Sequence, residues 1–244
     1  VEQLRYPHLR GKPVIVGNGV IASCSYEARR RGCYAGQSLS EARRMCPGVV
    51  VLDGCESVYR AFAERTFALC AELSPATETF LDEAFLDLTG TERLHGDLLE
   101  RAGALKRRVR QEVGLPVTAG LGPNRMLAKI ASKSVKPDGL RWIRAEEVED
   151  VLPGLPIDRL PGVGHRIGRE MAKLHVRTIG DLRAFPWLNV SLAAAGGFSW
   201  WSESLADYRD AAEGRAAGYY CGDQAVARGT YCGESFSRVF PSST

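Results

Sequence analysis

An acidic pair, Asp82-Glu83, interrupts a strand-like stretch at residues 77–90 (TETFLDEAFLDLTG). Neighbouring side chains of a strand point to opposite faces, so two adjacent carboxylates can share one site only where the chain bends. Ionised carboxylates are also costly to bury unless a cation or hydrogen bonds compensate. The pattern predicts a hairpin with arms at residues 78–81 and 84–88. The acidic pair at the turn of this hairpin is either a solvated tip or a binding site for a divalent metal ion. Asp87, further along the second arm, is predicted to be a structural acid or one at the rim of the site.

The elements around this hairpin predict an α+β fold. Apolar residues recur at helical spacing in residues 57–73 and 97–113, and residues 117–122 are strand-like. Two helices packed on one face of an antiparallel sheet would form a two-layer α+β architecture. A small α/β lobe is predicted upstream from strands at residues 12–16, 20–25 and 49–52 and helices at residues 26–31 and 38–46.

The composition is that of an ordinary globular protein, with 244 residues, 45% apolar and 25% charged. Lys and Arg outnumber Asp and Glu by 32 to 29, which permits a nucleic-acid partner without requiring one. The seven cysteines form no CxxC motif and are interpreted as reduced, mostly buried thiols. No apolar stretch approaches the ~20 residues that span a bilayer, so no membrane partner and a cytoplasmic location are predicted. The first residue is Val, which favours a fragment or a processed product.

A cationic cluster follows the second predicted strand, in the run YEARRR. The amino ends of helices attract anions, so Ser23, Tyr26 and Arg29 are candidates for holding phosphates. Arg29 lies one turn after Tyr26 on the same side of the predicted helix. The alternative is an ordinary basic surface.

A second basic segment follows the strand at residues 117–121. Asn124 is a suitable N-cap for a helix from residue 125 to about 135, along which Lys129, Lys133 and Lys136 recur every three to four residues. Taken alone, this spacing favours a solvated basic face. Lys136 precedes the turn Pro-Asp-Gly, which would project its ammonium toward an anionic phosphate tail.

A glycine-rich loop, Leu-Pro-Gly-Val-Gly at residues 160–164, lies between a short helix and a longer one at residues 165–174. Glycines permit close approach, and the backbone N–H groups of Gly162, Val163 and Gly164 would face a phosphate. The loop and the following helix at residues 176–182 resemble a helix-hairpin-helix motif, which grips the DNA backbone without reading sequence. A generic glycine-rich loop is the alternative.

In this order, the segments VEQL, GKPVIVG, SYEAR, LDEAFLDLTG, VTAGLGPNRMLAKIASKSVKPDG and LPGVGHRIG resemble Y-family translesion DNA polymerases of the DNA polymerase IV type. The resemblance implies a polymerase palm, a small α/β fingers lobe and an all-α helix-hairpin-helix thumb. The implied boundaries are fingers at 4–53, palm at 1–3 and 54–143, thumb at 144–215, and an irregular tail at 216–244 in place of a little finger.

The same resemblance implies site roles and partners. Asp82 and Glu83 become metal-binding catalytic carboxylates for two Mg²⁺ ions, and Tyr26, Arg29 and Lys136, with Ser23, hold the incoming triphosphate. The implied reaction is nucleotidyl transfer from a dNTP to the 3′-hydroxyl of a primer on template DNA, past damaged bases, with a sliding clamp as a partner of a C-terminal part that is missing here.

The 244-residue chain itself is expected to lack normal polymerase activity. The family has a further metal-binding aspartate upstream of the segment that matches VEQ. Two alternatives stay open: a catalytically inactive Y-family adaptor, and a helix-hairpin-helix DNA-binding repair scaffold.

Overall fold

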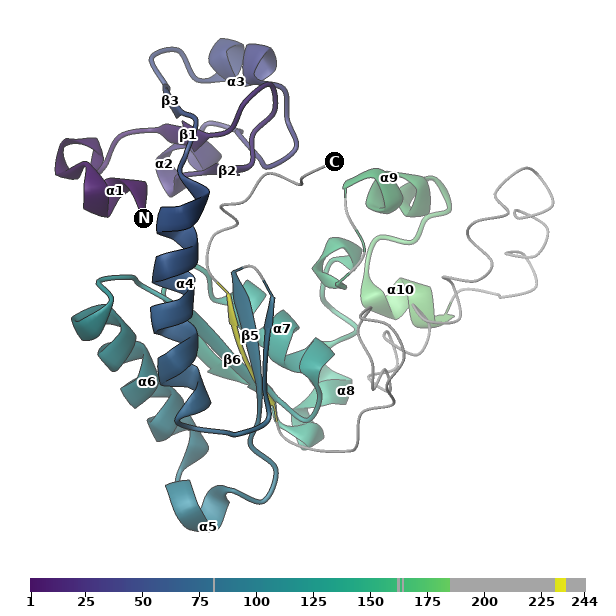
Figure 1. Ribbon diagram of the computed structural model, residues 1–244. Helices are drawn as coiled ribbons and strands as arrows, with labels where there is room; N and C mark the ends of the chain where they lie inside the picture. The colour runs from purple at the N-terminus through teal and green to yellow at the C-terminus, as the bar shows by residue number, and fades with distance from the viewer. Residues whose placement is uncertain (81, 162, 164, 185–230, 236–244) are drawn as a thin grey trace. The chain divides into compact units, whose positions relative to one another are not determined.

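The computed structural model describes residues 1–244 except 81, 162, 164, 185–230 and 236–244 (Figure 1). The described residues belong to two compact units. The first contains Val1–Ala84 and Ala104–Val117, and the second contains Phe85–Gly103 and the described residues between Thr118 and Glu234. In the described part of the chain, no helix is both long and apolar enough to cross a membrane.

The elements follow the predicted alternation of helices and strands closely. Up to the acidic pair they are α1 (Glu2–Arg5), η1 (Pro7–Leu9), β1 (Val14–Val16), β2 (Ser23–Cys24), α2 (Tyr26–Arg30), α3 (Leu39–Met45), β3 (Val50–Leu52), α4 (Glu56–Ala71) and β4 (Thr77–Phe80). After it come β5 (Glu83–Asp87), α5 (Glu92–His95), α6 (Leu98–Glu112), β6 (Thr118–Gly122), α7 (Arg125–Ser134), β7 (Leu140–Trp142), η2 (Ala145–Glu147), α8 (Val148–Val151), η3 (Ile157–Arg159), α9 (His165–Lys173), α10 (Ile179–Ala184) and β8 (Tyr231–Ser235).

The small N-terminal lobe is a three-stranded sheet with the order β2-β1-β3 (Figure 1). β1 pairs with β2 in antiparallel register, Ile15 opposite Cys24, and with β3 in parallel register, Val14 opposite Val50. Parallel neighbours need a long connection, which α2 and α3 supply between β2 and β3. The expected α/β lobe is therefore present.

The lobe is joined to α4 by a buried polar contact. Glu2 is only 6% exposed, and its Oε1 accepts a 2.6 Å hydrogen bond from the Tyr59 hydroxyl. Arg5 Nη1 also donates to the Glu2 carboxylate, at 3.1 Å. Burial and the bond to Glu2 raise the pKa of the Tyr59 phenol. The contact satisfies a carboxylate that would otherwise be costly to bury, and it fixes α1 against the start of α4.

The larger sheet has five strands in the order β4-β5-β8-β6-β7. The prediction of an antiparallel sheet is wrong for its last pair, because β6 and β7 run parallel with Ala119 opposite Leu140. The cause is the connection: α7 joins the two strands as a crossover helix, which returns the chain to the same edge in the same direction. Residues 231–235, expected within an irregular tail, form β8 between β5 and β6.

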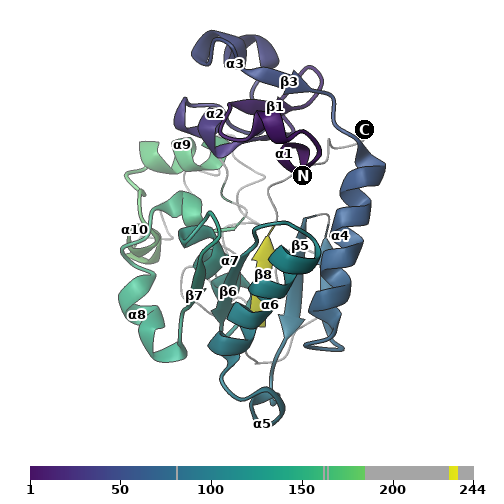
Figure 2. The same ribbon diagram turned by 90° about the vertical axis from the view of Figure 1, so that its left-hand side faces the viewer.

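Close packing of α7 on β6 accounts for the glycines of this strand, and Figure 2 shows the two elements beside β7. A Cβ at Gly120 would lie 2.2 Å from the Ala128 carbonyl oxygen, and one at Gly122 would lie 2.7 Å from the Ala128 nitrogen. All five residues of β6 are buried, so both faces of the strand are covered. Glycine at these two positions therefore lets the helix backbone lie directly against the strand.

The C-terminal helices share one core with α7. Fourteen buried residues from Met126 to Leu182 form a single apolar cluster that includes Leu160, Val163 and Ile179. Lys133 Nζ donates to the Asp158 carbonyl at 2.6 Å and ties α7 to η3. A bidentate pair between Arg183 and Glu149, at 2.9 and 3.0 Å, links α10 to α8.

Candidate active site

The acidic pair lies at the mouth of a hairpin, as predicted. β4 ends at Phe80, β5 begins at Glu83, and Asp82 is in the turn between them. Leu81 lies outside the described residues. Asp82 is only 8% exposed and Glu83 is half-buried, so a freely solvated tip does not describe this turn. A carboxylate desolvated to this degree is stable only with hydrogen bonds or a cation beside it.

The strand that carries Glu83 is anchored by the residues that follow it. Ala84, Phe85 and Leu86 are all buried. The guanidinium carbon of Arg125 lies 4.7 Å from the centroid of the Phe85 ring, a cation–π distance. Arg125 is 5% exposed at the first position of α7. Sequence reasoning missed this arginine because a cation at a helix start resembles a surface residue.

Asp87 has the structural role expected for it. Its Oδ1 accepts a hydrogen bond from the Thr89 N–H at 2.9 Å and a second bond from the Thr89 hydroxyl. These contacts stabilise the end of β5, as the local turn chemistry of aspartate favours.

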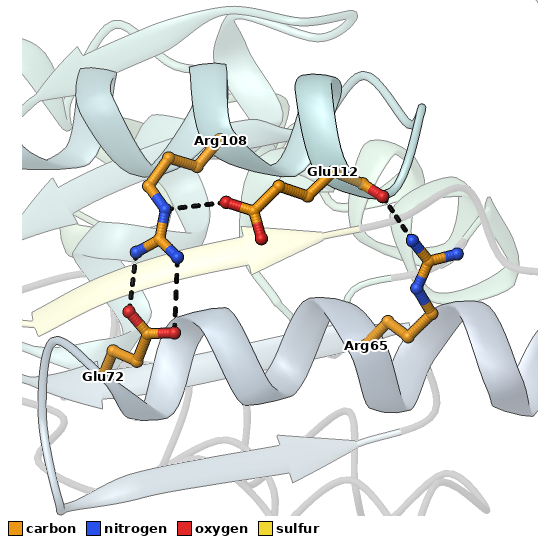
Figure 3. A network of polar contacts seen from close by, with 4 residues as sticks. All are labelled: Arg65, Glu72, Arg108 and Glu112. Carbon is orange, nitrogen blue, oxygen red and sulfur yellow. Dashed lines mark hydrogen bonds and ion pairs between the residues drawn. The ribbon is translucent and has the colours of Figure 1, made fainter.

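The helices before and after the hairpin are fixed by a polar network (Figure 3). Arg108 of α6 makes a bidentate pair with Glu72 at the end of α4, at 2.6 and 3.3 Å, and its Nε donates to Glu112 at 2.9 Å. Arg65 of α4 donates to the backbone carbonyl of Glu112. Hydrogen bonding to Arg108 lowers the pKa of Glu72. Because α4 leads directly into β4, the network sets where the hairpin begins.

The predicted phosphate face of the small lobe brings Tyr26 and Arg29 together. The guanidinium carbon of Arg29 is 5.9 Å from the Tyr26 ring centroid, and its Nε donates to the Cys24 carbonyl at 3.2 Å. Arg29 is exposed and Tyr26 is half-buried, whereas Ser23 is 5% exposed on β2. The arrangement presents one oriented cation next to one aromatic hydroxyl.

Helix polarity contributes less to this face than the sequence suggested. The N-cap of α2 is Ser25, and its hydroxyl oxygen accepts from the Ala28 N–H at 3.3 Å. The helix has only five residues, so its dipole is small. Any attraction of this face for an anion therefore depends mainly on its arginine side chains rather than on the helix dipole.

The three lysines of the second basic segment have different surroundings. The predicted N-cap is present, because Asn124 Oδ1 accepts from the Leu127 N–H at 2.9 Å. Lys129 and Lys133 are half-buried, and Lys136 is exposed after the helix end. The interpretation of a uniformly solvated basic face is wrong at Lys133, where burial lowers the pKa of an ammonium that bonds to η3.

Lys136 stands on an anchored turn in the second unit. The Asp138 N–H donates to Thr118 Oγ1 at 2.9 Å. Gly139 packs against Val135 with no room for a Cβ, which would lie 2.1 Å from the Val135 carbonyl oxygen. These two contacts hold the turn, on which Lys136 is exposed.

The predicted DNA-backbone loop is described only in part. Gly162 and Gly164 lie outside the described residues. Val163 is 4% exposed, and its N–H donates to the Leu160 carbonyl at 3.1 Å. Val163 therefore contributes through packing of the loop, and phosphate contacts by the two glycines stay a prediction.

The carboxylate oxygens of the hairpin are chemically suitable ligands for a divalent cation. Hard cations such as Mg²⁺ prefer carboxylate oxygens and are bound through one or two carboxylates together with substrate phosphates. Asp82 and Glu83 supply two carboxylates. Over the described ranges, no cluster of three or more His, Cys, Asp or Glu side chains is close enough to hold a metal by itself.

Comparison with known proteins agrees with these features. Residues 1–133 match the model of the impB/mucB/samB family. A DNA polymerase IV of Ralstonia nicotianae is 38% identical over 191 residues, which cover 76% of this chain and 54% of the relative. The chain therefore spans about half the length of that relative.

Two solved structures share the fold. The crystal structure of DinB from Sulfolobus solfataricus has a TM-score of 0.77 and 27% identity, covering 89% of this chain and 64% of the other. An insertion ternary complex of Dbh DNA polymerase has a TM-score of 0.74 at 27% identity, with the same coverage. The resemblance read from the sequence is confirmed, and the chain belongs to the impB/mucB/samB family of Y-family DNA polymerases.

Proposed function

We propose that this chain carries the palm and fingers functions of a translesion DNA polymerase, which transfers a nucleotide from a dNTP to a primer 3′-hydroxyl. The observation that carries the proposal is the hairpin that brings Asp82, largely buried, and Glu83 to one turn in a polymerase fold. Relatives named as DNA polymerase IV and a solved ternary complex of a related polymerase support DNA and nucleotide as partners.

The side chains of the chain divide the work as follows. Asp82 and Glu83 would hold two divalent cations, Mg²⁺ in the proposal, which stabilise charge on the attacking and departing oxygens when bound. Tyr26 and Arg29 would hold the β- and γ-phosphates by charge-assisted hydrogen bonds, with Ser23 as a minor contributor. Lys136, exposed on its turn, adds a further positive charge. These roles are positioning and electrostatics, without a covalent enzyme intermediate.

DNA would be held by the backbone of a helix-hairpin-helix thumb. Gly162 and Gly164 are the proposed phosphate contacts, and the buried Val163 keeps their loop on the core shared with α7. Because such contacts do not read bases, binding would be independent of sequence and sensitive to salt. A sliding clamp is a further proposed partner.

Nucleotide binding tests the fingers assignment without requiring turnover. Arg29→Ala should weaken binding of a fluorescent dATP analogue by tenfold or more, because a charge-assisted hydrogen bond contributes about 1.5–3 kcal/mol. Arg30→Ala is the matched control: it removes the same charge from the next residue, which is exposed and pairs only loosely with Glu27 at 3.6 Å. If both changes weaken nucleotide binding equally, the face is a general basic surface and not a specific phosphate site.

Cation binding tests the acidic pair. Mg²⁺ at about 100 times its dissociation constant should stabilise a protein by about 2.7 kcal/mol, seen as a higher thermal midpoint. Asp82→Asn should remove most of this shift, and Asp87→Asn, a change at the far end of the strand that begins at Glu83, should retain it. If Asp82→Asn keeps the full shift, the pair is not the cation site.

Primer extension separates the enzyme from the alternatives. With only two carboxylates contributed, the 244-residue chain is expected to extend a primer far more slowly than a complete DNA polymerase IV. Extension at the full rate would refute this. DNA binding without nucleotide or Mg²⁺ binding would favour the adaptor or scaffold.

A further inference from the structure

The positive charge of the chain is concentrated in its small N-terminal lobe. Residues 1–55 contain eight Lys and Arg side chains and four Asp and Glu side chains, whereas the rest of the chain contains 24 and 25. One of the four acids, Glu2, is buried and bonded to Arg5. The lobe therefore carries more than the net charge of +3 of the whole chain, and charge localised in this way favours an anionic partner.

Part of this charge lies where the ends of α2 and α3 meet. The Nη1 atom of Arg31, at the end of α2, is 3.7 Å from the sulfur of Cys46, at the end of α3. The methyl group of Met45 lies against the end of α2, because a Cβ on Gly32 would be 2.5 Å from it. Arg31 and Arg44 are both exposed, and among the described residues neither of them is in an ion pair. Their charges are thus available to an external anion.

Two large exposed side chains belong to the same part of the lobe. Tyr34 is 40% exposed and Met45 is 45% exposed. The buried side chain of Gln37 holds both: its Oε1 accepts from the Tyr34 N–H at 3.3 Å, and its Nε2 donates to the Met45 sulfur at 3.0 Å. An exposed aromatic ring near arginines is the combination that binds unpaired bases and their phosphates. The residues Arg31, Tyr34, Arg44 and Met45 are named the α2–α3 surface.

The α2–α3 surface differs from the proposed triphosphate face. The Nε of Arg29 donates to the Cys24 carbonyl on β2, whereas Arg31 reaches Cys46 at the end of α3. Residues two apart along a helix do not face each other. The two arginines therefore serve different faces of the lobe, and the proposed nucleotide chemistry of Tyr26 and Arg29 does not account for the second one.

We propose that the α2–α3 surface binds single-stranded nucleic acid. The guanidinium groups of Arg31 and Arg44 pair with backbone phosphates, and the Tyr34 ring stacks on an unpaired base beside the Met45 thioether. Because the bases of a duplex are already stacked on one another, the ring contributes only with a single strand. The identity of that strand rests on the proposed function, since the template of a polymerase is unpaired until it is copied.

Fluorescence anisotropy of a labelled oligothymidylate of about 12 nucleotides, mixed with the 244-residue chain, tests the cations. Arg31→Ala and Arg44→Ala should each weaken binding several-fold and lower the slope of log affinity against log salt by about 0.7, the value for one phosphate contact on a single strand. Arg43→Ala is the matched control, because this exposed arginine of α3 is two residues before Met45 and so lies on another side of the helix. The control should leave the slope unchanged.

The tyrosine tests stacking separately from charge. Tyr34→Ala should weaken binding of the oligothymidylate about fivefold or more and leave the salt slope unchanged, because the change removes a ring and no charge. Tyr34→Phe keeps the ring and should retain the affinity. Neither change should affect binding of a blunt duplex of the same length.

Four outcomes would overturn the proposal. They are an unchanged affinity in Arg31→Ala, Arg44→Ala and Tyr34→Ala, an equal loss in Arg43→Ala, a loss in Tyr34→Phe as large as in Tyr34→Ala, and equal displacement of the oligothymidylate by poly-glutamate, which would indicate an acidic protein as the partner. Arg44→Ala and the two Tyr34 variants decide the matter even if Arg31→Ala fails to fold.

Binding of the fluorescent dATP analogue is measured on the same variants. It should be unchanged in Arg31→Ala and Arg44→Ala, whereas Arg29→Ala weakens it. Failure of the α2–α3 surface and failure of the proposed nucleotide site therefore give different results.

Discussion

Replacing Gly120 by alanine should displace α7 from the sheet. The new Cβ would lie 2.2 Å from the Ala128 carbonyl oxygen and 2.3 Å from the Ser132 nitrogen, whereas ordinary contacts begin at 3.4 Å. The distance between β6 and the backbone of α7 must therefore grow by 3.4 − 2.2 Å, roughly 1 Å. No side-chain rotation can relieve this clash, because the atoms that it meets belong to the helix backbone.

The expected cost is at the upper end of overpacking penalties, about 3 kcal/mol. Urea unfolding followed by far-UV circular dichroism would measure it. Gly154→Ala is the matched control, because nothing lies within 4 Å of its Cβ position and its φ is not in the left-handed region. This control should be neutral or slightly stabilising, through the lower entropy of the unfolded chain. If Gly120→Ala unfolds at the same urea concentration as the control, the close contact of β6 with α7 is wrong.

Two further changes test individual contacts. Tyr59→Phe removes the 2.6 Å hydrogen bond to buried Glu2 and should lower the free energy of unfolding in urea by about 1.5–3 kcal/mol. Tyr6→Phe is the control, because its ring is 39% exposed, and it should change this free energy little. Equal effects of the two changes would contradict the contact between Tyr59 and Glu2. Two backbone N–H groups lower the pKa of Asp181 below its ordinary 3.8, so its stabilising effect is present above that value and is lost as the pH falls through the lowered pKa. Asp181→Asn should flatten the acid limb of the stability curve, and an unchanged limb would show that this carboxylate is not responsible for it.

The sequence alone predicted the structural features that depend on residues close together along the chain. The hairpin follows from two adjacent acids in a strand pattern, and Asn124 is the N-cap that its residue type predicts. The long helices α4 and α6 begin and end within two residues of their predicted limits. In each case the determining contacts lie within a few residues along the chain.

Features that depend on distant partners were missed. The parallel pairing of β6 with β7 depends on how α7 returns the chain, and β8 enters the sheet from far along the sequence. Burial of Arg125 requires the Phe85 ring, forty residues upstream. Periodicity specifies which side of a helix a residue occupies, but it does not specify what packs against that side.

The lysines of α7 and its exit show how this limit affects the reading of a site. Lys133 and Lys136 follow the same spacing, and by sequence either suits an anion. The structure separates them because η3 packs beside Lys133, so its ammonium bonds to the Asp158 carbonyl and is partly desolvated. Lys136 lies beyond the end of this helix at Ser134, and it is exposed on the anchored turn. An ammonium that already has a backbone partner must break that bond to meet a phosphate. Lys133 is therefore suited to holding the C-terminal helices on the core rather than to binding a mobile anionic substrate.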